Sequence, residues 1–345
     1  MPYLSGMSES KAMILGAAGT ALTAEETAFY RGERPWGFIL FARNIAEPQQ
    51  IRDLVAEMRD CVGRPDAPVF IDQEGGRVQR LRPPLAQSYP PAASVGAVYR
   101  ADAEAGERAA WLMARLHAFD LASYGITADC LPVLDVPIEG AHDVIGNRAW
   151  EKNPQAVARM GRAAAEGLMS GGVLPVMKHI PGHGRAFADT HKELPTVTTS
   201  LDELRRHDFP PFKALADLGM AMTAHVVYAA IDPDAPATLS PRVIGEIIRG
   251  EIGFDGLLMT DDLSMKALSG DFSGRAAAAL AAGCDVVLHC NGLMEEMRAV
   301  AAGAAPLRGR ALQRAARALE PLANADGADE AALRNEFWSH FEAVA

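Results

Sequence analysis

The segment from Lys178 to Glu193, KHIPGHGRAFADTHKE, contains the densest group of residues able to do chemistry. It follows an apolar run, turns at proline and glycine, and carries Asp189 and His191 with one residue between them. A carboxylate beside an imidazole orients the ring and sets its protonation state, which suits acid and base catalysis near neutral pH. We therefore expect Asp189 and His191 to transfer protons from a loop that opens and closes.

Two other interpretations of this loop stay open at this point. It is a polar surface loop whose histidines are only solvated, or it is a metal site with ligands from the set His179, His183, Asp189 and His191. Neutral imidazoles and a carboxylate suit zinc. The spacing does not match HExxH, however, and we expect no metal.

A second group is the acid pair Asp261-Asp262 in the sequence MTDDLSM, at the end of another apolar run. Neighbouring strand residues point to opposite sides, so one acid faces a site and the other faces packing or caps. We expect only one of the two to react, and Asp262 or Ser264 to cap the helix that follows.

The third group is the stretch DQEGGRVQR, from Asp72 to Arg80. Its acids and amide accept or share hydrogen bonds with hydroxyls, and its arginines donate in a fixed fork, so it suits a polyhydroxylated ligand. A phosphate-binding loop is the alternative, but neither GxGxxG nor GxxxxGK[ST] is present.

Eight short apolar runs alternate with helix-length periodic segments and would position these groups. The runs span 11–18, 36–42, 68–72, 127–136, 173–180, 220–227, 256–262 and 284–290, and helical patterns include 47–62, 105–125, 153–172 and 240–253. Strands covered by helices on both faces are continuous apolar runs of this kind. The pattern predicts an α/β fold, a single-domain (β/α)8 TIM-type barrel, with a doubly wound open sheet as the alternative.

The barrel is favoured because the reactive side chains follow the carboxyl ends of the runs, and those ends meet on one face of a barrel. They are Asp72, Asp135, Lys178-His179, His225, Asp261-Asp262 and His289. Of these, Asp135, His225 and His289 are expected to satisfy local hydrogen bonds rather than touch a ligand.

The composition excludes several classes of protein. The 345 residues carry 33 basic and 44 acidic side chains, a net charge of −11, which argues against nucleic-acid binding. With 49% hydrophobic residues and no apolar run of 18, we expect a globular chain without a membrane span. We expect one domain over residues 1–345, in which 320–345 forms a C-terminal helical tail that docks through Trp338 and Phe341.

The first residues could be taken for an export signal, because 12–24 is apolar and ends in small residues. Glu9 interrupts the basic start, however, and Thr23 and Glu26 have capping-box spacing, so we expect a strand followed by a helix. Four cysteines without CxxC spacing favour a reducing compartment.

With these motifs in view, the chain resembles family 3 of the glycoside hydrolases, and within it the single-domain bacterial β-N-acetylhexosaminidases of cell-wall recycling. The resemblance covers about residues 10–320. It rests on ILFARN (39–44), DQEGGRVQR (72–80), IGNRAW (145–150), KHIPGHG (178–184) with DTH (189–191), and TDDLSM (260–265). The combination of KHIPGHG with DTH is specific, whereas the acid pair alone is weak.

Residue by residue, the resemblance implies roles for eight positions. Asp261 matches the nucleophile, and His191, paired with Asp189, matches the acid/base. The sugar-binding positions of the family match Asp72, Arg80, Arg148, Lys178 and His179. Thr260 and Asn147 depart from the usual serine and acid, and neither departure removes a catalytic group.

The implied activity is the removal of a non-reducing terminal N-acetylglucosamine, with retention, from GlcNAc-anhydroMurNAc with or without its peptide. The resemblance also implies a cytoplasmic monomer of peptidoglycan recycling whose partner is a small carbohydrate or muropeptide substrate, with no cofactor, nucleic acid or membrane. One alternative is a β-N-acetylglucosaminide phosphorylase, because an imidazole acid/base would not repel phosphate. Another is a non-catalytic carbohydrate-binding protein on the same scaffold.

Overall fold

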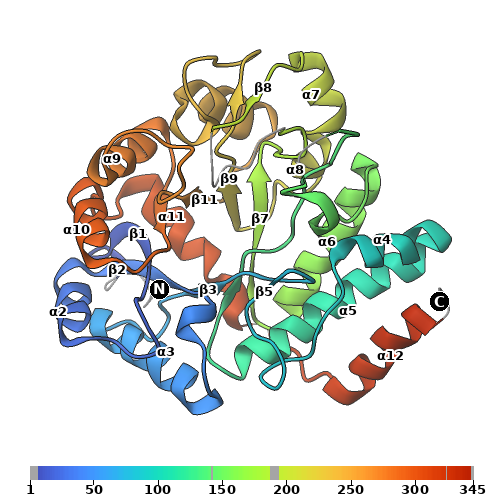
Figure 1. Ribbon diagram of the computed structural model, residues 1–345, viewed down its shortest axis with the longest axis horizontal. Coiled ribbons are helices and arrows are strands. Elements are labelled where there is room, and N and C mark those ends of the chain that lie inside the picture. Colours follow the sequence, from blue (N-terminus) through green and yellow to red (C-terminus); the bar gives the residue numbers. More distant parts are fainter. Residues whose placement is uncertain (1–6, 141–142, 187–193, 324, 343–345) are drawn as a thin grey trace.

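The computed structural model describes residues 7–140, 143–186, 194–323 and 325–342. Eight parallel strands close into a barrel in the order β1-β12-β11-β9-β7-β6-β3-β2, and helices surround it (Figure 1). The strands are β1 (Lys11–Gly16), β2 (Pro35–Leu40), β3 (Val69–Ile71), β6 (Ala128–Asp129), β7 (Leu174–Ile180), β9 (Met220–Thr223), β11 (Leu257–Asp262) and β12 (Val286–His289). The predicted (β/α)8 barrel is confirmed, and the open-sheet alternative is wrong.

Each predicted run supplies one barrel strand, but two strands are shorter than expected. The run 127–136 is regular only at Ala128–Asp129, because Pro132 has no N–H to donate. The chain nevertheless stays beside β7, where the Pro132 carbonyl accepts from the Lys178 N–H at 3.0 Å. The run 220–227 leaves the barrel after Thr223 and pairs again as β10 (Val227–Tyr228) with β8 (Thr196–Val197).

The helices begin where the sequence places capping residues. The Thr23 side chain accepts from the Glu26 N–H and Glu26 reciprocates, so the predicted capping box is present. The Asn153 side chain accepts from the two N–H groups that follow Pro154. The main helices are α2 (Ala24–Glu33), α3 (Pro48–Val62), α4 (Ala92–Ala101), α5 (Ala103–Ala122), α6 (Pro154–Ser170), α7 (Leu201–His207), α8 (Pro210–Ala214), α9 (Phe272–Ala282), α10 (Met294–Gly303), α11 (Gly309–Ala318) and α12 (Glu330–Glu342).

One predicted helix differs in type. The segment expected to be helical over 240–253 is a π-helix, η4, at Val243–Glu251. Gly245 and Gly250 reduce its preference for a regular α-helix. Its buried positions still lie on one face, so the apolar pattern was correct although the helix type was not.

The barrel has two layers of apolar packing. One cluster fills the barrel interior and includes Ile14, Phe70, Val176, Met222 and Leu288. The other lies between the strands and the surrounding helices. The interior is therefore a packed core below the face that carries the polar residues.

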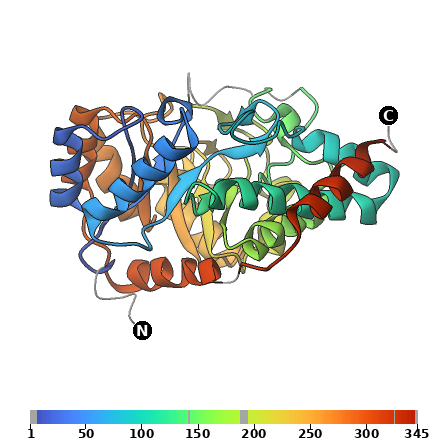
Figure 2. The same cartoon turned by 90° about the horizontal axis from the view of Figure 1, so that it is seen from below.

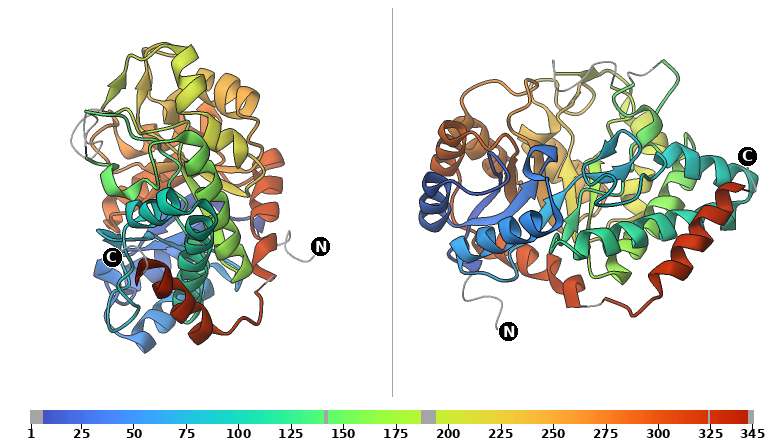
Figure 3. Two further views of the ribbon diagram at one scale, coloured as in Figure 1. Left: turned by 90° about the vertical axis from the view of Figure 1, so that its right-hand side faces the viewer. Right: turned by 60° about the horizontal axis from the view of Figure 1, so that its bottom comes forward.

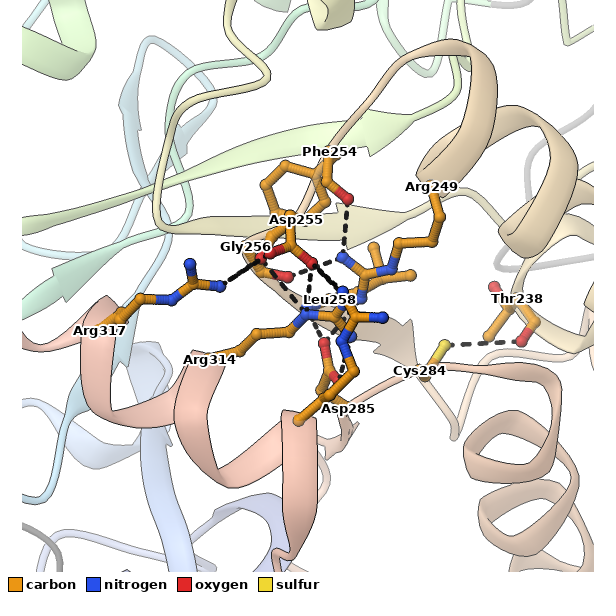
Figure 4. A network of polar contacts seen from close by, with 11 residues as sticks. Thr238, Arg249, Phe254, Asp255, Gly256, Leu258, Cys284, Asp285, Arg314 and Arg317 are labelled. Atoms are coloured by element: carbon orange, nitrogen blue, oxygen red, sulfur yellow. Dashed lines mark hydrogen bonds and ion pairs between the residues drawn. The ribbon is translucent and has the colours of Figure 1, made fainter.

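Helix α11 closes the amino-terminal end of the barrel, at the bottom of Figure 2. Ala315 and Ala318 contribute to the interior cluster, while arginines of the same helix pair with acids at the starts of β11 and β12. Asp285 is the buried acid of this network (Figure 4). It accepts from Arg249 at 2.7 Å and from Arg314 at 3.1 Å.

Helix α12 packs along α5 at the outer edge of the molecule (Figure 3). Phe337 is its fully buried side chain. Arg334 donates to Asp120 at 2.7 Å and to the Tyr89 hydroxyl at 2.9 Å. Within the described residues, none of the helices combines the length and the apolar character that a membrane crossing requires.

Candidate active site

A pocket of about 160 Å³ opens at the carboxyl ends of the barrel strands. Polar and apolar side chains share its wall. They are Ile39, Phe41, Asp72, Val78, Arg80, Val144, Ile145, Arg148, Lys178, His179, His183, Met222, Asp261, Asp262, Met265, Leu288 and Cys290. The pocket thus brings together all the predicted site residues that the structure describes. Asp189 and His191 lie outside the described residues.

A short hairpin places Asp72 and Arg80 side by side. Strand β4 (Gln73–Gly75) runs antiparallel to β5 (Val78–Gln79), and the turn between them needs left-handed backbone at Gly75 and Gly76, with φ of 97° and 57°. Arg80 Nη2 donates to Asp72 Oδ2 at 2.9 Å as a result. The glycine pair of the motif therefore has a structural reason.

Lys178 projects from β7 and is only 2% exposed. Its Nζ donates to Asp72 Oδ1 at 2.9 Å and lies 2.6 Å from Glu74 Oε1. Burial alone would lower the pKa of Lys178, but the two carboxylates raise it above its usual value. Burial would raise the pKa of Asp72, but Lys178 and Arg80 hold it below its usual range. All of these groups are charged at neutral pH.

Glu74 is a site residue that the sequence predictions missed. Its carboxylate receives Arg148 Nε at Oε2 and Arg148 Nη2 at Oε1, both at 2.8 Å. Burial acts to raise the pKa of Glu74, but Arg148 and Lys178 lower it to about 2. Its partner Arg148 is 74 residues away in the sequence, so the spacing of nearby residues did not mark Glu74.

The buried carboxylate of Asp135 orients the imidazole ring of His179. Its Nδ1 lies 2.7 Å from Asp135 Oδ2, and Asp135 Oδ1 accepts the backbone N–H groups of His179 and His183 at 3.2 and 2.6 Å. Burial would raise the pKa of Asp135, but the two imidazoles lower it to about 2. A carboxylate acceptor at this place keeps a proton on Nδ1 of His179.

The two acids at the end of β11 have different surroundings. Asp262 accepts from the Ser264 N–H at 3.0 Å, from the Ser264 hydroxyl, and from the Cys290 N–H at 3.1 Å. Asp261 accepts only the Asp262 N–H, at 2.8 Å, among the hydrogen bonds within the described residues. Asp262 thus holds backbone and Asp261 keeps an oxygen free of these contacts, although both acids line the pocket. The expected cap was wrong, because the next helix, α9, begins ten residues later and is capped by Asp271.

Asp261 is ionised although it is partly buried. Burial acts to raise the pKa of its carboxyl, and the nearby His179, His225 and Lys178 lower it below its usual value. The register between β11 and β12 shifts between Met259 and Asp262. Such bulges commonly re-aim a side chain beside an active site.

His225 and His289 lie behind the pocket wall, as predicted. His225 Nδ1 contacts the Thr238 hydroxyl at 2.7 Å, and its Nε2 lies 3.0 Å from the Asp262 carbonyl. His289 Nε2 lies 3.0 Å from Glu296. These histidines support the ends of the strands.

The described part of the chain contains no group of three or more His, Cys, Asp or Glu side chains arranged to hold a metal ion. The rings of His179 and His183 lie 5.6 Å apart, between centroids. Two of the four ligands in the zinc interpretation, Asp189 and His191, are outside the described residues.

The pocket can recognise a hydroxyl-rich ligand and present a carboxylate to it. Arg80, Arg148 and Lys178 can donate hydrogen bonds to the oxygen atoms of a ligand, and the Asp72 carboxylate can accept them from its hydroxyls. Apolar residues such as Phe41 and Met265 complete the wall. A barrel that presents an ionised acid with few protein contacts, Asp261, in such a pocket has the equipment of a glycosidase.

Comparison with known proteins assigns the class. Residues 17–317 match the glycosyl hydrolase family 3 N terminal domain, and the chain belongs to this family of glycoside hydrolases. It is 41% identical over 287 residues to a β-hexosaminidase of Stenotrophomonas maltophilia K279a, covering 81% of this chain and 83% of that one. It is 42% identical over 282 residues to a β-hexosaminidase of Pseudomonas aeruginosa PAO1, covering 81% and 82%.

The solved structures that resemble this chain include enzymes of the same family. The structure of NagZ from Neisseria gonorrhoeae in complex with N-trifluoroacetyl-D-glucosamine has a TM-score of 0.84 and 32% identity, over 97% of both chains. A family 3 β-N-acetylglucosaminidase from Paenibacillus sp. FPU-7 has a TM-score of 0.82 and 30% identity, covering 97% of this chain and 62% of that one.

Proposed function

We propose that this glycoside hydrolase is a retaining exo-β-N-acetylglucosaminidase. The observation that carries the proposal is the pocket in which the Asp261 carboxylate faces a cluster of hydroxyl-binding groups. Relatives named β-hexosaminidase, and a neighbour solved with an N-acylated glucosamine, support a terminal N-acetylglucosamine as the sugar removed. At about 160 Å³ the pocket is smaller than the roughly 300–1,000 Å³ usual for larger ligands, so it suits one sugar ring.

In this proposal Asp72, Arg80, Arg148, Lys178 and His179 bind the hydroxyl and acetamido groups of that sugar. The three cations donate to oxygen atoms, and Asp72 accepts from hydroxyls. His179 presents Nε2 because its Nδ1 is engaged by Asp135. Binding by many directed contacts fixes C1 of the sugar beside Asp261.

Hydrolysis then takes two steps. The Asp261 carboxylate attacks C1, and the bond from C1 to the departing oxygen breaks while protonated His191 gives that oxygen its proton. In the second step neutral His191 takes a proton from water, whose oxygen attacks C1 and releases Asp261 as a carboxylate. Two inversions retain the β configuration. Asp189 orients His191, and neither step needs a cofactor.

The natural substrate we propose is a peptidoglycan fragment, GlcNAc-1,6-anhydroMurNAc with or without its peptide. The enzyme would act on it as a cytoplasmic monomer during cell-wall recycling. The β-hexosaminidase relatives and the NagZ neighbour support the sugar that is removed, and the motifs shared with the cell-wall recycling enzymes support the rest of the proposal. Chromatography of such fragments after incubation should show free N-acetylglucosamine and the shortened muropeptide.

The nucleophile is tested with a nitrophenyl β-N-acetylglucosaminide. The wild type should release nitrophenol, and Asp261→Ala should lose on the order of 10⁴-fold in kcat or more while its thermal melt stays cooperative. Full activity in that variant would move the role to Asp262. Trapping with a 2-acetamido-5-fluoro glycosyl fluoride, followed by peptide mapping, should label Asp261.

The same substrate separates hydrolysis from phosphorolysis. In phosphate buffer we expect free N-acetylglucosamine as the product. N-acetylglucosamine 1-phosphate as the main product would instead establish a phosphorylase.

A further inference from the structure

Glu74 holds two of the cations of the sugar pocket without forming part of its wall. The side chain is 3% exposed and is absent from the residues that line the cavity. Oε1 meets both Lys178 Nζ, at 2.6 Å, and Arg148 Nη2, at 2.8 Å. Oε2 receives Arg148 Nε at 2.8 Å. Both oxygens are therefore engaged by protein cations, and neither is turned toward a ligand.

Arg148 depends on this carboxylate for its position. It comes from a short 3-10 turn, η2 (Gly146–Arg148), rather than from a barrel strand. Its other hydrogen bond in the described structure is from Nη1 to the Val144 carbonyl, only four residues away, at 3.2 Å. The bidentate contact with Glu74 is thus the one that ties the guanidinium to the β4–β5 hairpin, which follows barrel strand β3. An arginine held as a fork is fixed in plane and direction.

Glu74 also balances charge close to the reacting carbon. The pocket wall carries three cations, Arg80, Arg148 and Lys178, and three acids, Asp72, Asp261 and Asp262. Asp72 is shared by Arg80 and Lys178, and Glu74, ionised beneath the wall, is the carboxylate paired with Arg148. Glycoside cleavage passes through a transition state with positive charge on the sugar ring, so an excess cation nearby raises the barrier.

We infer that Glu74 is a positioning residue of the active site: its carboxylate holds Arg148 and Lys178 at the sugar and compensates their charge. This inference rests on the proposed function, in which those two cations contact the sugar. Glu74 takes no part in proton transfer or in bond formation. It acts through the side chains that do touch substrate.

The test compares Glu74→Gln with a matched variant, Glu336→Gln. Glu336, on the outer helix α12, also accepts two hydrogen bonds from one arginine. Arg108 donates to its Oε1 and Oε2 at 2.7 and 2.9 Å. We expect Glu74→Gln to lower kcat/KM for the nitrophenyl substrate about 10²-fold, with a fall in kcat as well as a rise in KM. Glu336→Gln should stay within threefold of wild type. Equal kinetics of the two variants, both folded by circular dichroism, would overturn the inference.

A double-mutant cycle asks whether Glu74 works through Arg148. In the Arg148→Met background, Glu74→Gln should cost at least fivefold less than in the wild type, because one of its two partners is already absent. An equal loss in both backgrounds would contradict the inference. If Glu74→Gln does not fold, Glu74→Asp takes its place, since it keeps the charge but withdraws the carboxylate. Wild-type kinetics in Glu74→Asp would also overturn the inference.

Failure of the proposed function is recognised separately. If the wild type cleaves no N-acetylglucosaminide, the proposed function fails, and the inference is then judged by a crystal structure of Glu74→Gln. Displacement of the Arg148 guanidinium by more than about 1 Å would support the positioning role. An unmoved guanidinium would refute it.

Discussion

Buried charges in this protein are stable because each has a partner within hydrogen-bonding distance. Lys178 lies between Asp72 and Glu74, and Asp135 receives two backbone N–H groups and an imidazole. Leaving one member of such a group unpaired costs several kcal/mol. Removing any one of the paired charged residues of the pocket therefore also leaves its partners without a counter-charge.

Asp129 departs from this rule. It is fully buried on β6, and its polar neighbours within the described residues are the Gln73 N–H at 3.0 Å and the His117 ring at 3.7 Å. Burial raises the pKa of the Asp129 carboxyl well above its usual value, since the Gln73 N–H does not offset it. Burial also lowers the pKa of His117 to about 3. Both shifts favour the uncharged forms of these two neighbouring groups.

We expect Asp129→Asn to become more stable than the wild type as pH rises. A carboxyl with a raised folded pKa contributes its stability fully below the unfolded pKa of about 4 and loses it as pH increases toward the folded pKa. The loss is about 1.4 kcal/mol for each pH unit in that window, and an uncharged amide is free of it. Urea unfolding at pH 4.0 and 7.5 measures the difference between the two proteins.

The control for this experiment is Asp217→Asn. Asp217 is 70% exposed and pairs with Arg162, whose hydrogen bond lowers the pKa of Asp217. The contribution of Asp217 to the free energy of unfolding is small because water screens the ion pair. It is lost as pH falls, whereas that of Asp129 is lost as pH rises. An Asp129→Asn advantage that does not change with pH would mean that Asp129 is ionised in the folded protein.

The types and spacing of the residues predicted much of the site. Asp72, Lys178, His179 and Asp261 follow apolar runs, and that position alone placed them on one face of a barrel. Glu74 escaped prediction because its partner Arg148 is 74 residues away in sequence, and only the folded chain brings them together. A charge whose function is to hold other charges has no pattern of its own in sequence.

The elements divide chemistry and stability between the two ends of the barrel. Loops at the carboxyl ends carry the pocket, whereas α11 and its ion pairs close the other end. Asp285 in this network receives Arg249, Arg314 and the Leu258 N–H at 2.9 Å. In this fold the loops at the carboxyl ends of the strands form the site, and the residues at the amino-terminal end stabilise the barrel.

We expect Asp285→Ala to reduce the free energy of unfolding by about 3 kcal/mol, because it leaves two arginines without their buried partner. Asp255→Ala should cost less than about 1 kcal/mol, although Asp255 pairs with Arg310, Arg314 and Arg317, because it is 52% exposed. Both variants should keep the kcat of the wild type. Denaturant titration ranks them, and equal losses would show that burial does not decide the strength of this network.

At the scale of the whole molecule, α12 is an addition to a barrel that closes without it. The family match ends at residue 317, and α12 spans Glu330–Glu342. It is fixed by Phe337, which packs against Tyr89 with ring centroids 6.2 Å apart, and by Arg334. Tyr89 in turn donates its N–H to the side-chain oxygen of Gln79 in the β4–β5 hairpin at 3.0 Å, so the helix supports that hairpin from outside.

We expect Phe337→Ala to release α12 without unfolding the barrel. Truncation of a buried Phe removes about 3 kcal/mol of packing, which corresponds to roughly a hundredfold faster amide exchange if the helix opens locally. Hydrogen exchange read by mass spectrometry should speed up in α12 and leave β7 and β11 protected. Trp338→Ala, at a side chain that is 37% exposed, should have a smaller effect. Equal loss of protection in the barrel strands would make α12 part of the cooperative unit.

The sequence by itself determined the fold class, because buried parallel strands must be apolar throughout and reactive residues must then follow their ends. It also determined which strand end presents Asp261. The tertiary structure alone decided which charges neutralise one another: Glu74 with Arg148, Asp135 with His179, and Asp285 with the arginines of the opposite end. These partners are dozens of residues apart in the sequence and meet only when the barrel closes, so the local sequence pattern does not predict the pairs.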